Sequence, residues 1–342
     1  MIVSENISFK NVLIWSAPHL ILLFVLSSSV CLLFYFEILN LKIPWLPVSV
    51  IGTAVAFYVG FKNNQSYDRM WEVRKIWGGI VNASRSWGIQ VNGYVNTLFK
   101  ESDEQIDVKA IKKKLIYRHI AWLYAHRAQL LKPTSWEHHK SYWKIFKGPG
   151  KLRKAGLDRF KAEHESISLA DYLEGDELSE LDVAANKATQ IINQQSTDLE
   201  QLRAQSLIDD FRHVEMMQTL GGFYELQGKN ERIKKFPLPR QYANISSYFT
   251  IIFILLLPFT LIPEIMDVGY LGWLVAAPIT VLVSWVYVLM ELVGYYSQNP
   301  FQGMTNDIPM LSLCRTIDID LRQILEETEL PDPIDAKNNV LM

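Results

Sequence analysis

The chain has 342 residues, of which 49% are hydrophobic and 12% aromatic, and its formal net charge is −2 at pH 7. This composition suits a protein that is partly embedded in a membrane, and the length leaves ample chain for a core outside it. The balance of charges gives no reason to expect a nucleic acid as a partner.

Four hydrophobic stretches without Asp, Glu, Lys or Arg lie toward the two ends of the chain. They cover residues 20–36, 43–61, 245–263 and 268–290. Each is close to the ~20 residues that an α-helix needs to cross the hydrocarbon core of a bilayer. The sequence therefore predicts an all-α membrane protein with four transmembrane helices.

These stretches divide the chain into four parts. We expect a first transmembrane hairpin over 1–61, a cytoplasmic helical domain over 62–242, a second hairpin over 243–290 and a C-terminal segment over 291–342. Within the large domain, apolar residues at helical spacing predict a continuation of the second span to about residue 99. They also predict helices over 106–131 and 182–221, the last ending at Gly221-Gly222.

The distribution of basic residues predicts the orientation. Of the 34 Lys and Arg residues, 29 fall between Lys62 and Arg240, whereas the connection 37–47 holds only Lys42 and 264–267 holds none. Basic residues close to membrane ends stay in the cytoplasm, so both termini and the middle of the chain are expected there. Residues 291–342 carry nine acidic against three basic groups. Either this tail lies along the basic domain of its own or a neighbouring subunit, or both are ordinary solvated surfaces.

Motifs for catalysis are missing. The sequence has no phosphate-binding glycine loop, no Gly-x-Ser-x-Gly elbow and no cysteine pair at zinc spacing, so neither an enzyme nor a cofactor is expected. His119 and His126 are seven residues apart and share a helix face, but packing is a better expectation than a metal site. The spans hold no charged residue, which disfavours a proton-coupled transporter.

The second span carries the clearest pattern. Thr53, Phe57 and Phe61 repeat at i, i+4 and i+8, which places them along one helix face. If several copies of this helix surrounded an axis, the ridge would form a hydrophobic constriction that gates by dewetting. From the spacing alone, contact with lipid or another span is the favoured alternative. The other faces carry small residues that permit close helix packing: Gly52, Ala54, Ala56 and Gly60.

Two groups of motifs resemble those of the bestrophin family, and the resemblance extends over essentially the whole chain. One follows the second span and contains Asp68, Arg69, Trp71 and Glu72. The other follows the fourth span and contains Asn299, Pro300 and Phe301, then the run 306–309. From the residues alone, we expect Asp68, Arg69 and Glu72 to form a salt-bridge cluster just below the membrane, with direct contact to ions as the alternative.

The resemblance implies a homopentameric ion channel in the cytoplasmic (inner) membrane, in which four further copies of the chain complete a central pore. It places the pore neck at Thr53, Phe57 and Phe61, where Thr53 departs from the bulky aliphatic residue usual in the family. Asn63 and Asn64 would lie below the neck, either meeting ions or capping backbone. Counting back from Pro239 puts an exit constriction near Phe211, with Ile208 one turn earlier.

Selectivity stays open at this stage. The family as a whole resembles chloride and anion channels, but some bacterial members favour monovalent cations, and a membrane-anchored scaffold or sensor is the alternative of another class. Animal bestrophins follow Asn-Pro-Phe with several carboxylates that bind calcium, whereas the run 302–307 here has only Asp307. No metal site and no calcium control of the animal type are therefore expected.

Overall fold

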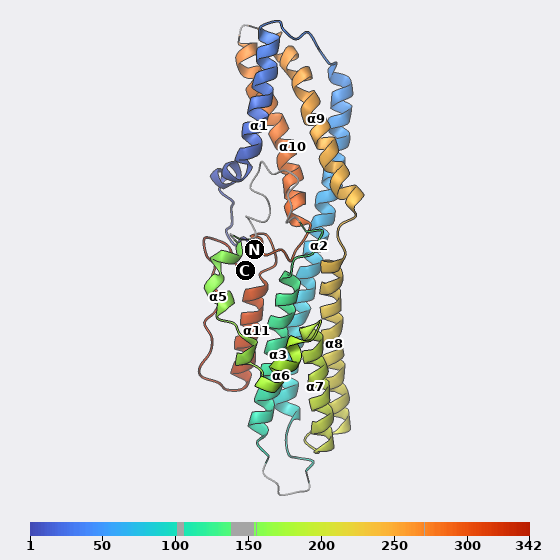
Figure 1. The fold of residues 1–342 in the computed structure, drawn as a ribbon, viewed down its shortest axis with the longest axis vertical. Coiled ribbons are helices and arrows are strands. Elements are labelled where there is room, and N and C mark those ends of the chain that lie inside the picture. Colours follow the sequence, from blue (N-terminus) through green and yellow to red (C-terminus); the bar gives the residue numbers. More distant parts are fainter. Residues whose placement is uncertain (101–105, 138–153, 155, 270) are drawn as a thin grey trace.

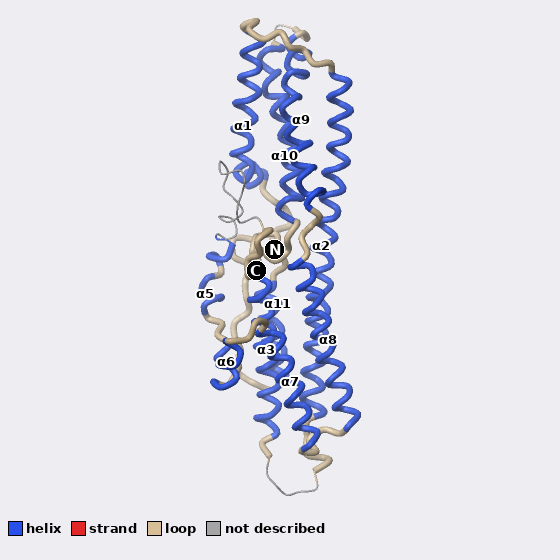
Figure 2. The backbone as a smooth tube through the Cα atoms, turned by 45° about the vertical axis from the view of Figure 1, so that its right-hand side comes forward, coloured by secondary structure: helices blue, strands red, loops and turns tan. Residues whose placement is uncertain are grey.

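The computed structural model describes residues 1–342 except 101–105, 138–153, 155 and 270. The molecule is a long rod of two stacked helical bundles, and a single helix runs through both (Figures 1 and 2). The regular elements of the described chain are helices, accompanied by isolated β-bridges that join Val340 to Ile2 and to Lys337. The predicted all-α fold is confirmed.

The first bundle, called here the membrane bundle, contains four helices that are long and apolar enough to cross a bilayer. They are α1 (Phe9–Tyr35), the first half of α2 (Trp45–Tyr94), α9 (Arg240–Met266) and α10 (Gly272–Ser297). Each extends beyond its charge-free stretch at the end toward the distal bundle, whereas α2 and α10 begin two and four residues later than predicted, at Trp45 and Gly272. The bundle packs closely where Gly52 of α2 faces Phe253 of α9, because a Cβ atom on Gly52 would lie 2.7 Å from that ring.

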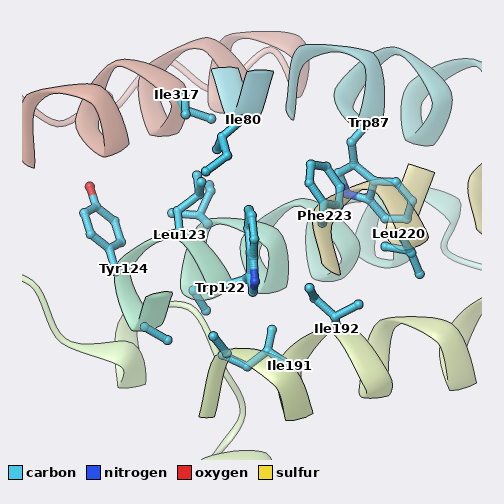
Figure 3. Packing of buried hydrophobic residues seen from close by; sticks show 14 of the residues in the cluster. Ile80, Trp87, Trp122, Leu123, Tyr124, Ile191, Ile192, Leu220, Phe223 and Ile317 are labelled. Carbon is cyan, nitrogen blue, oxygen red and sulfur yellow. The ribbon is translucent and has the colours of Figure 1, made fainter. Parts of the chain in front are cut away.

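The second bundle, called here the distal bundle, is built around the second half of α2. Its other long helices are α3 (Val108–Leu131), α7 (Lys187–Ala204), α8 (Asp210–Lys235) and α11 (Met310–Ile324). Figure 3 shows the large side chains that fill its centre, among them Trp87 of α2, Trp122 of α3 and Phe223 of α8. These aromatic residues bury the most apolar area per side chain, so they dominate the stability of this core.

The predicted single helix over 182–221 is wrong. The segment holds the end of α6 (Gly175–Asp182), all of α7 and the first half of α8. The chain turns after Ala204, where Ser206 adopts a positive φ of 58°, and the side chain of Asp209 caps α8 by accepting from Arg212 N at 2.9 Å. Gly221-Gly222 lies inside α8, with open space beside both Cα atoms.

The acidic tail lies along the basic domain of its own subunit. Helix α11 packs on α2, and Asp320 accepts from Arg85 Nε at 2.8 Å. Beyond the helix, Glu327 pairs with Lys113 of α3 at 3.3 Å. Two short helical elements lie in the same region. They are α5 (Lys161–Glu165), beside α11, and the 3-10 turn η1 (Leu169–Asp171), beside α3. The tail therefore contacts the basic domain of its own chain, which is one of the alternatives that the sequence left open.

Candidate pore helix

One face of α2 remains uncovered within the subunit. Thr53, Phe57 and Phe61 lie on this face, and the two phenylalanine rings are 67% and 63% exposed. They line an open groove together with Ala56, Gly60, Asn64 and Tyr287. A large apolar side chain that is exposed on a membrane helix needs lipid or another protein surface beside it.

The opposite face of α2 is a buried seam. Its residues recur at alternating intervals of four and three: Val48, Gly52, Val55, Val59, Lys62 and Ser66. This spacing is typical of a helix packed along a neighbour in the manner of a coiled coil. The ridge points away from the helices of its own subunit because the seam faces α9 and α10.

The two asparagines below the ridge point in different directions. Asn63 is half-buried, and its Nδ2 donates to the carbonyl of Met290 on α10 at 3.0 Å. Asn64 is exposed and lies in the groove with Phe61. The sequence did not decide whether either residue caps backbone or meets ions. In the subunit, Asn63 binds the backbone of α10, and Asn64 lies on the same uncovered face as the ridge.

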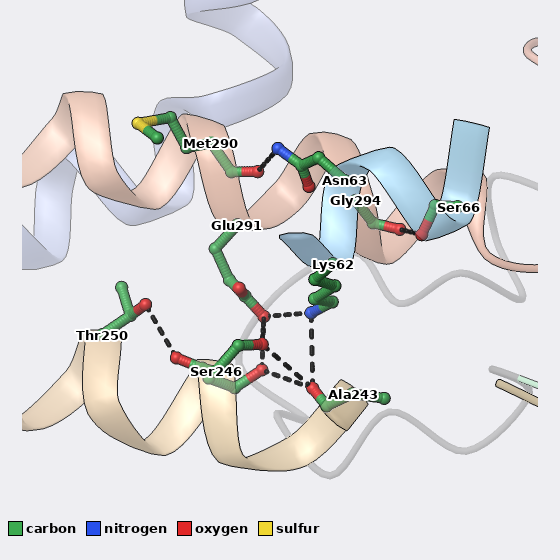
Figure 4. A network of polar contacts seen from close by, with 10 residues as sticks. Lys62, Asn63, Ser66, Ala243, Ser246, Thr250, Met290, Glu291 and Gly294 are labelled. Atoms are coloured by element: carbon green, nitrogen blue, oxygen red, sulfur yellow. Dashed lines mark hydrogen bonds and ion pairs between the residues drawn. The ribbon is translucent and has the colours of Figure 1, made fainter. Parts of the chain in front are cut away.

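A buried ion pair joins α2 to α10 at the level of these asparagines, and the sequence analysis missed it. The ammonium of Lys62 pairs with the Glu291 carboxylate and also donates to the carbonyl of Ala243 on α9 at 3.3 Å (Figure 4). Ser247 donates to the same carboxylate at 2.5 Å. Lys62 and Glu291 each follow a charge-free stretch by one residue, so counting charges inside the spans could not find them. The signal available in the sequence was that each of the two opposite charges stands directly after the end of a span.

The signature residues after the second span do not form the predicted salt-bridge cluster. Arg69 instead donates to two carbonyls near helix ends, Gln298 O after α10 and Ile233 O in α8, each at 3.0 Å. Glu72 pairs with Arg232 of α8 at 2.5 Å. A cation at the C-terminal end of a helix is favoured by the helix dipole, which explains the position of Arg69. Of the remaining two, Asp68 is exposed and Trp71 stacks on Tyr67 with ring centroids 6.4 Å apart.

The second signature, after α10, is buried. Asn299 and Phe301 are 9% and 1% exposed, and Pro300 is buried with them. Phe301 belongs to the core of the distal bundle, so this segment links the end of the membrane bundle to that core.

The Asp307 carboxylate accepts hydrogen bonds from the backbone of its own loop. Its Oδ2 accepts from Gly303 N at 2.7 Å and from Met304 N at 3.1 Å. Burial raises the pKa of this carboxyl to about 7, against the opposing effect of the two backbone donors. A carboxylate engaged in this way is poorly placed to bind a divalent ion. Asp318 and Asp320, two residues apart on α11, point to different partners, since Tyr124 donates to Asp318 and Arg85 donates to Asp320.

The two candidates for the exit constriction differ in exposure. Ile208 is 1% exposed and belongs to the distal core, whereas Phe211 at the start of α8 is 89% exposed. A side chain buried inside one subunit cannot line a passage between subunits. Ile208 is therefore the wrong choice, and Phe211 remains as a prediction.

His119 and His126 stack on either side of Trp122, with ring centroids 5.2 Å and 5.7 Å from it. His119 Nε2 is 2.9 Å from Ser84 Oγ, and His126 Nε2 is 3.1 Å from Asn230 Nδ2. Burial lowers the pKa of the two imidazoles to about 3 and about 4, respectively. Among the residues that the structure describes, no group of three or more His, Cys, Asp or Glu side chains is arranged to hold a metal ion.

The fold and the uncovered helix define a class, that of integral membrane proteins whose bundle continues into a second bundle outside the bilayer. Comparison with known proteins agrees with this class. The family model described as "Bacterial/Fungal Bestrophin protein" matches residues 7–323. The chain belongs to the bestrophin family.

Named relatives cover nearly the full chain. The voltage-dependent anion channel-forming protein YneE of Escherichia coli (strain K12) is 26% identical over 319 residues, which span 93% of this chain and 89% of that protein. A voltage-dependent anion channel-forming protein of Ralstonia nicotianae is 24% identical and covers 97% of both chains. The crystal structure of a bacterial bestrophin homolog from Klebsiella pneumoniae has a TM-score of 0.70 at 20% identity, covering 91% of this chain and 98% of its own.

Proposed function

We propose that this chain is the subunit of a homopentameric anion channel in the cytoplasmic membrane. Each copy contributes α2 to a central pore, and ions move passively through it. The neck is lined by Thr53, Phe57 and Phe61, with Asn64 directly below it and Phe211 at the far end of the distal bundle. Both termini, the distal bundle and the C-terminal segment lie in the cytoplasm.

The observation that carries this proposal is the outward ridge of α2. Two phenylalanines that are about two-thirds exposed lie on the same helix face, one turn apart, and the groove beside them contains Gly60 with open space at its Cα. Such a ridge becomes a hydrophobic constriction when copies of the helix surround an axis, and a constriction of this kind gates by dewetting. Membership of the family and the names of the relatives, which are called anion channel-forming proteins, support anions as the permeant species.

The distribution of charge supports the orientation. The exposed Lys42–Asp267 pair, 3.1 Å apart, joins the two loops at the far end of the membrane bundle. These loops hold few basic residues, whereas the distal bundle holds most of them, and basic segments remain in the cytoplasm.

A planar bilayer containing the purified protein under a potassium chloride gradient tests the proposal. A reversal potential close to the chloride equilibrium potential is the expected result. A value close to the potassium equilibrium potential would instead identify a monovalent-cation channel. An assembled protein that carries no current at any voltage would contradict conduction and favour a membrane-anchored scaffold or sensor.

A further inference from the structure

We infer that Lys62 and Glu291 are positioning residues of the channel: their ion pair fixes the rotation and axial position of α2 and thereby sets which side chains face the neck. This inference rests on the proposed function, because it concerns the aperture at Phe57 and Phe61. It assigns a role to a pair that lies behind the neck and touches no permeant ion.

The first step is the composition of the buried seam of α2. Toward the loops, this seam is apolar or small, at Val48, Gly52, Val55 and Val59. The valines contribute contacts that are non-directional, whereas Gly52 fits closely against the ring of Phe253 on α9. The apolar part of the seam therefore holds α2 against α9 and α10, and its close fit at Gly52 is chiefly to Phe253 of α9.

The second step is the polar continuation of the same seam. Lys62, Ser66 and Arg69 follow at intervals of four and three residues, and all three are donors. Their acceptors are Glu291, the carbonyl of Gly294 at 3.2 Å and the carbonyl of Gln298 at 3.0 Å. The acceptors recur at intervals of three and four, as expected for parallel neighbouring helices, and α2 and α10 do run in parallel (Figure 1).

Among these three donors, only Lys62 distinguishes one alignment of α2 and α10 from the next, because any turn of α10 offers carbonyls but only one offers Glu291. Moving α2 by one turn would set Lys62 opposite Val288 or Tyr295, neither of which has a carboxylate. The Lys62 side chain is fully buried, so its charge would then have no counter-charge and no water. A single buried polar position is the best-attested device for fixing the register of packed helices.

The third step connects the pair to the neck. Phe61 precedes Lys62, and Asn63 follows it with its Nδ2 bound to Met290 O. Successive residues are about 100° apart around a helix, so a rotation by one position would carry Phe61 into the seam and Asn63 onto the open face. Figure 4 shows Lys62 between Glu291 and the carbonyl of Ala243, so α9 limits the rotation from the other side.

A role in positioning can be separated from a role in stability by the double variant Lys62→Met/Glu291→Met. Replacing a buried ion pair by apolar residues of similar volume is often neutral for stability, but it removes the directional contact. The test measures the reaction of cysteines with a water-soluble thiol reagent. The probes are Phe61→Cys on the open face and Val59→Cys in the seam, each in a chain whose buried Cys31 and Cys314 are replaced by Ser. The double variant Lys42→Met/Asp267→Met, which removes the exposed pair between the loops, is the matched control.

In the parent and in the control, Phe61→Cys should react far faster than Val59→Cys. In the Lys62→Met/Glu291→Met background, the ratio of the two rates should fall by about threefold or more. Single-channel recordings of that variant should show several conductance levels, and the charge exchange Lys62→Glu/Glu291→Lys should recover a single main level. An unchanged labelling ratio in a folded double variant would overturn the inference. Because labelling requires no current, a silent parent channel would contradict the proposed function and leave this test of position intact.

Discussion

Asn63 and Asn64 are neighbours in the chain but belong to different faces of α2. Asn63 donates to the Met290 carbonyl at 3.0 Å, whereas Asn64 lies exposed in the groove beside Phe61. This divergence marks the boundary between the seam, which holds α2 in the subunit, and the ridge, which the subunit leaves uncovered. It makes the ridge the natural place to test conduction.

The double variant Phe57→Ala/Phe61→Ala should conduct more than the parent. Removing two rings widens the constriction and lowers the barrier to wetting, so open probability or unitary conductance should increase. Single-channel recording measures both. Phe24→Ala is the control, since Phe24 is 56% exposed but belongs to α1. Parent-like currents from a correctly assembled double variant would contradict the assignment of the neck.

The mass of the solubilised protein should correspond to five chains. Small residues beside the ridge favour close packing of neighbouring α2 helices, and the family resemblance implies five copies. Native mass measurement or light scattering in mild detergent should give about five times the mass of one chain. A stable monomer or dimer would be incompatible with a shared central pore.

Ile208 and Phe211 should respond oppositely to truncation. Ile208→Ala removes a buried side chain from the distal core and should cost about 2–5 kcal/mol of folding free energy. Phe211→Ala removes a ring that is 89% exposed, so it should leave stability nearly unchanged while altering conductance or rectification. Thermal unfolding and bilayer recording of the same two preparations make the comparison. If Phe211→Ala leaves the currents unaltered, the exit constriction lies elsewhere.

Acid should destabilise the distal bundle through His119 and His126. In the unfolded chain a histidine has a pKa near 6.5, whereas burial lowers the folded pKa of these two to about 3 and about 4. Below pH 6.5 the unfolded state therefore binds more protons, and stability falls as the pH decreases. The loss between pH 7.5 and pH 5 should be about 2 kcal/mol per histidine.

Unfolding measured across this pH range checks the effect, and His119→Phe/His126→Phe should flatten the profile. Asp307 acts in the other direction, because burial raises its folded pKa from 3.8 to about 7, which adds stability as the pH falls from 7 toward 4. The comparison is therefore cleanest when all variants carry Asp307→Asn. A steep profile that survives loss of both histidines would show that other groups control acid stability.

Calcium should not control the channel. A tight site needs about 6–8 oxygen ligands, usually with several carboxylates. The run 302–309 contains a single carboxylate, that of Asp307, which already accepts hydrogen bonds from two backbone amides. Removing calcium with a chelator and restoring it at micromolar levels should leave open probability unchanged. A reversible change that Asp307→Ala abolishes would show that this segment binds calcium.

The sequence predicted the parts of the fold that depend on long periodic patterns. The four apolar spans, the continuation of the second one and the helix over 106–131 all follow from composition and spacing, which act locally. The break at 205–209 escaped because Ser206 and Asp209 create it through a positive φ and a side-chain cap, signals that span only a few residues. The glycine pair at 221–222 was wrongly predicted to end a helix, because glycine lowers helix propensity without forbidding a helix.

The site was predicted unevenly for a related reason. Spacing along α2 is enough to place Thr53, Phe57 and Phe61 on one face, and the structure leaves that face uncovered. Burial and pairing depend on elements far apart in the chain. Lys62 and Glu291 are separated by 229 residues, and Arg69 reaches Ile233 across 164. No local pattern encodes such contacts, so the buried ion pair and the true partners of Arg69 became evident only in three dimensions.

Helix α2 continues without interruption from Trp45 to Tyr94. At about 1.5 Å per residue, its segment from Phe61 to Tyr94 is roughly 50 Å long. A rigid tilt of α2 around Lys62 would therefore move its longer part, outside the bilayer, further than its shorter part inside the bilayer. A tilt of about 2° around the level of Lys62 would displace its far end by roughly 2 Å while shifting the rings at the neck by only a fraction of that distance. Under the proposed function, a movement of the distal end of α2 would therefore reach the neck as a much smaller one.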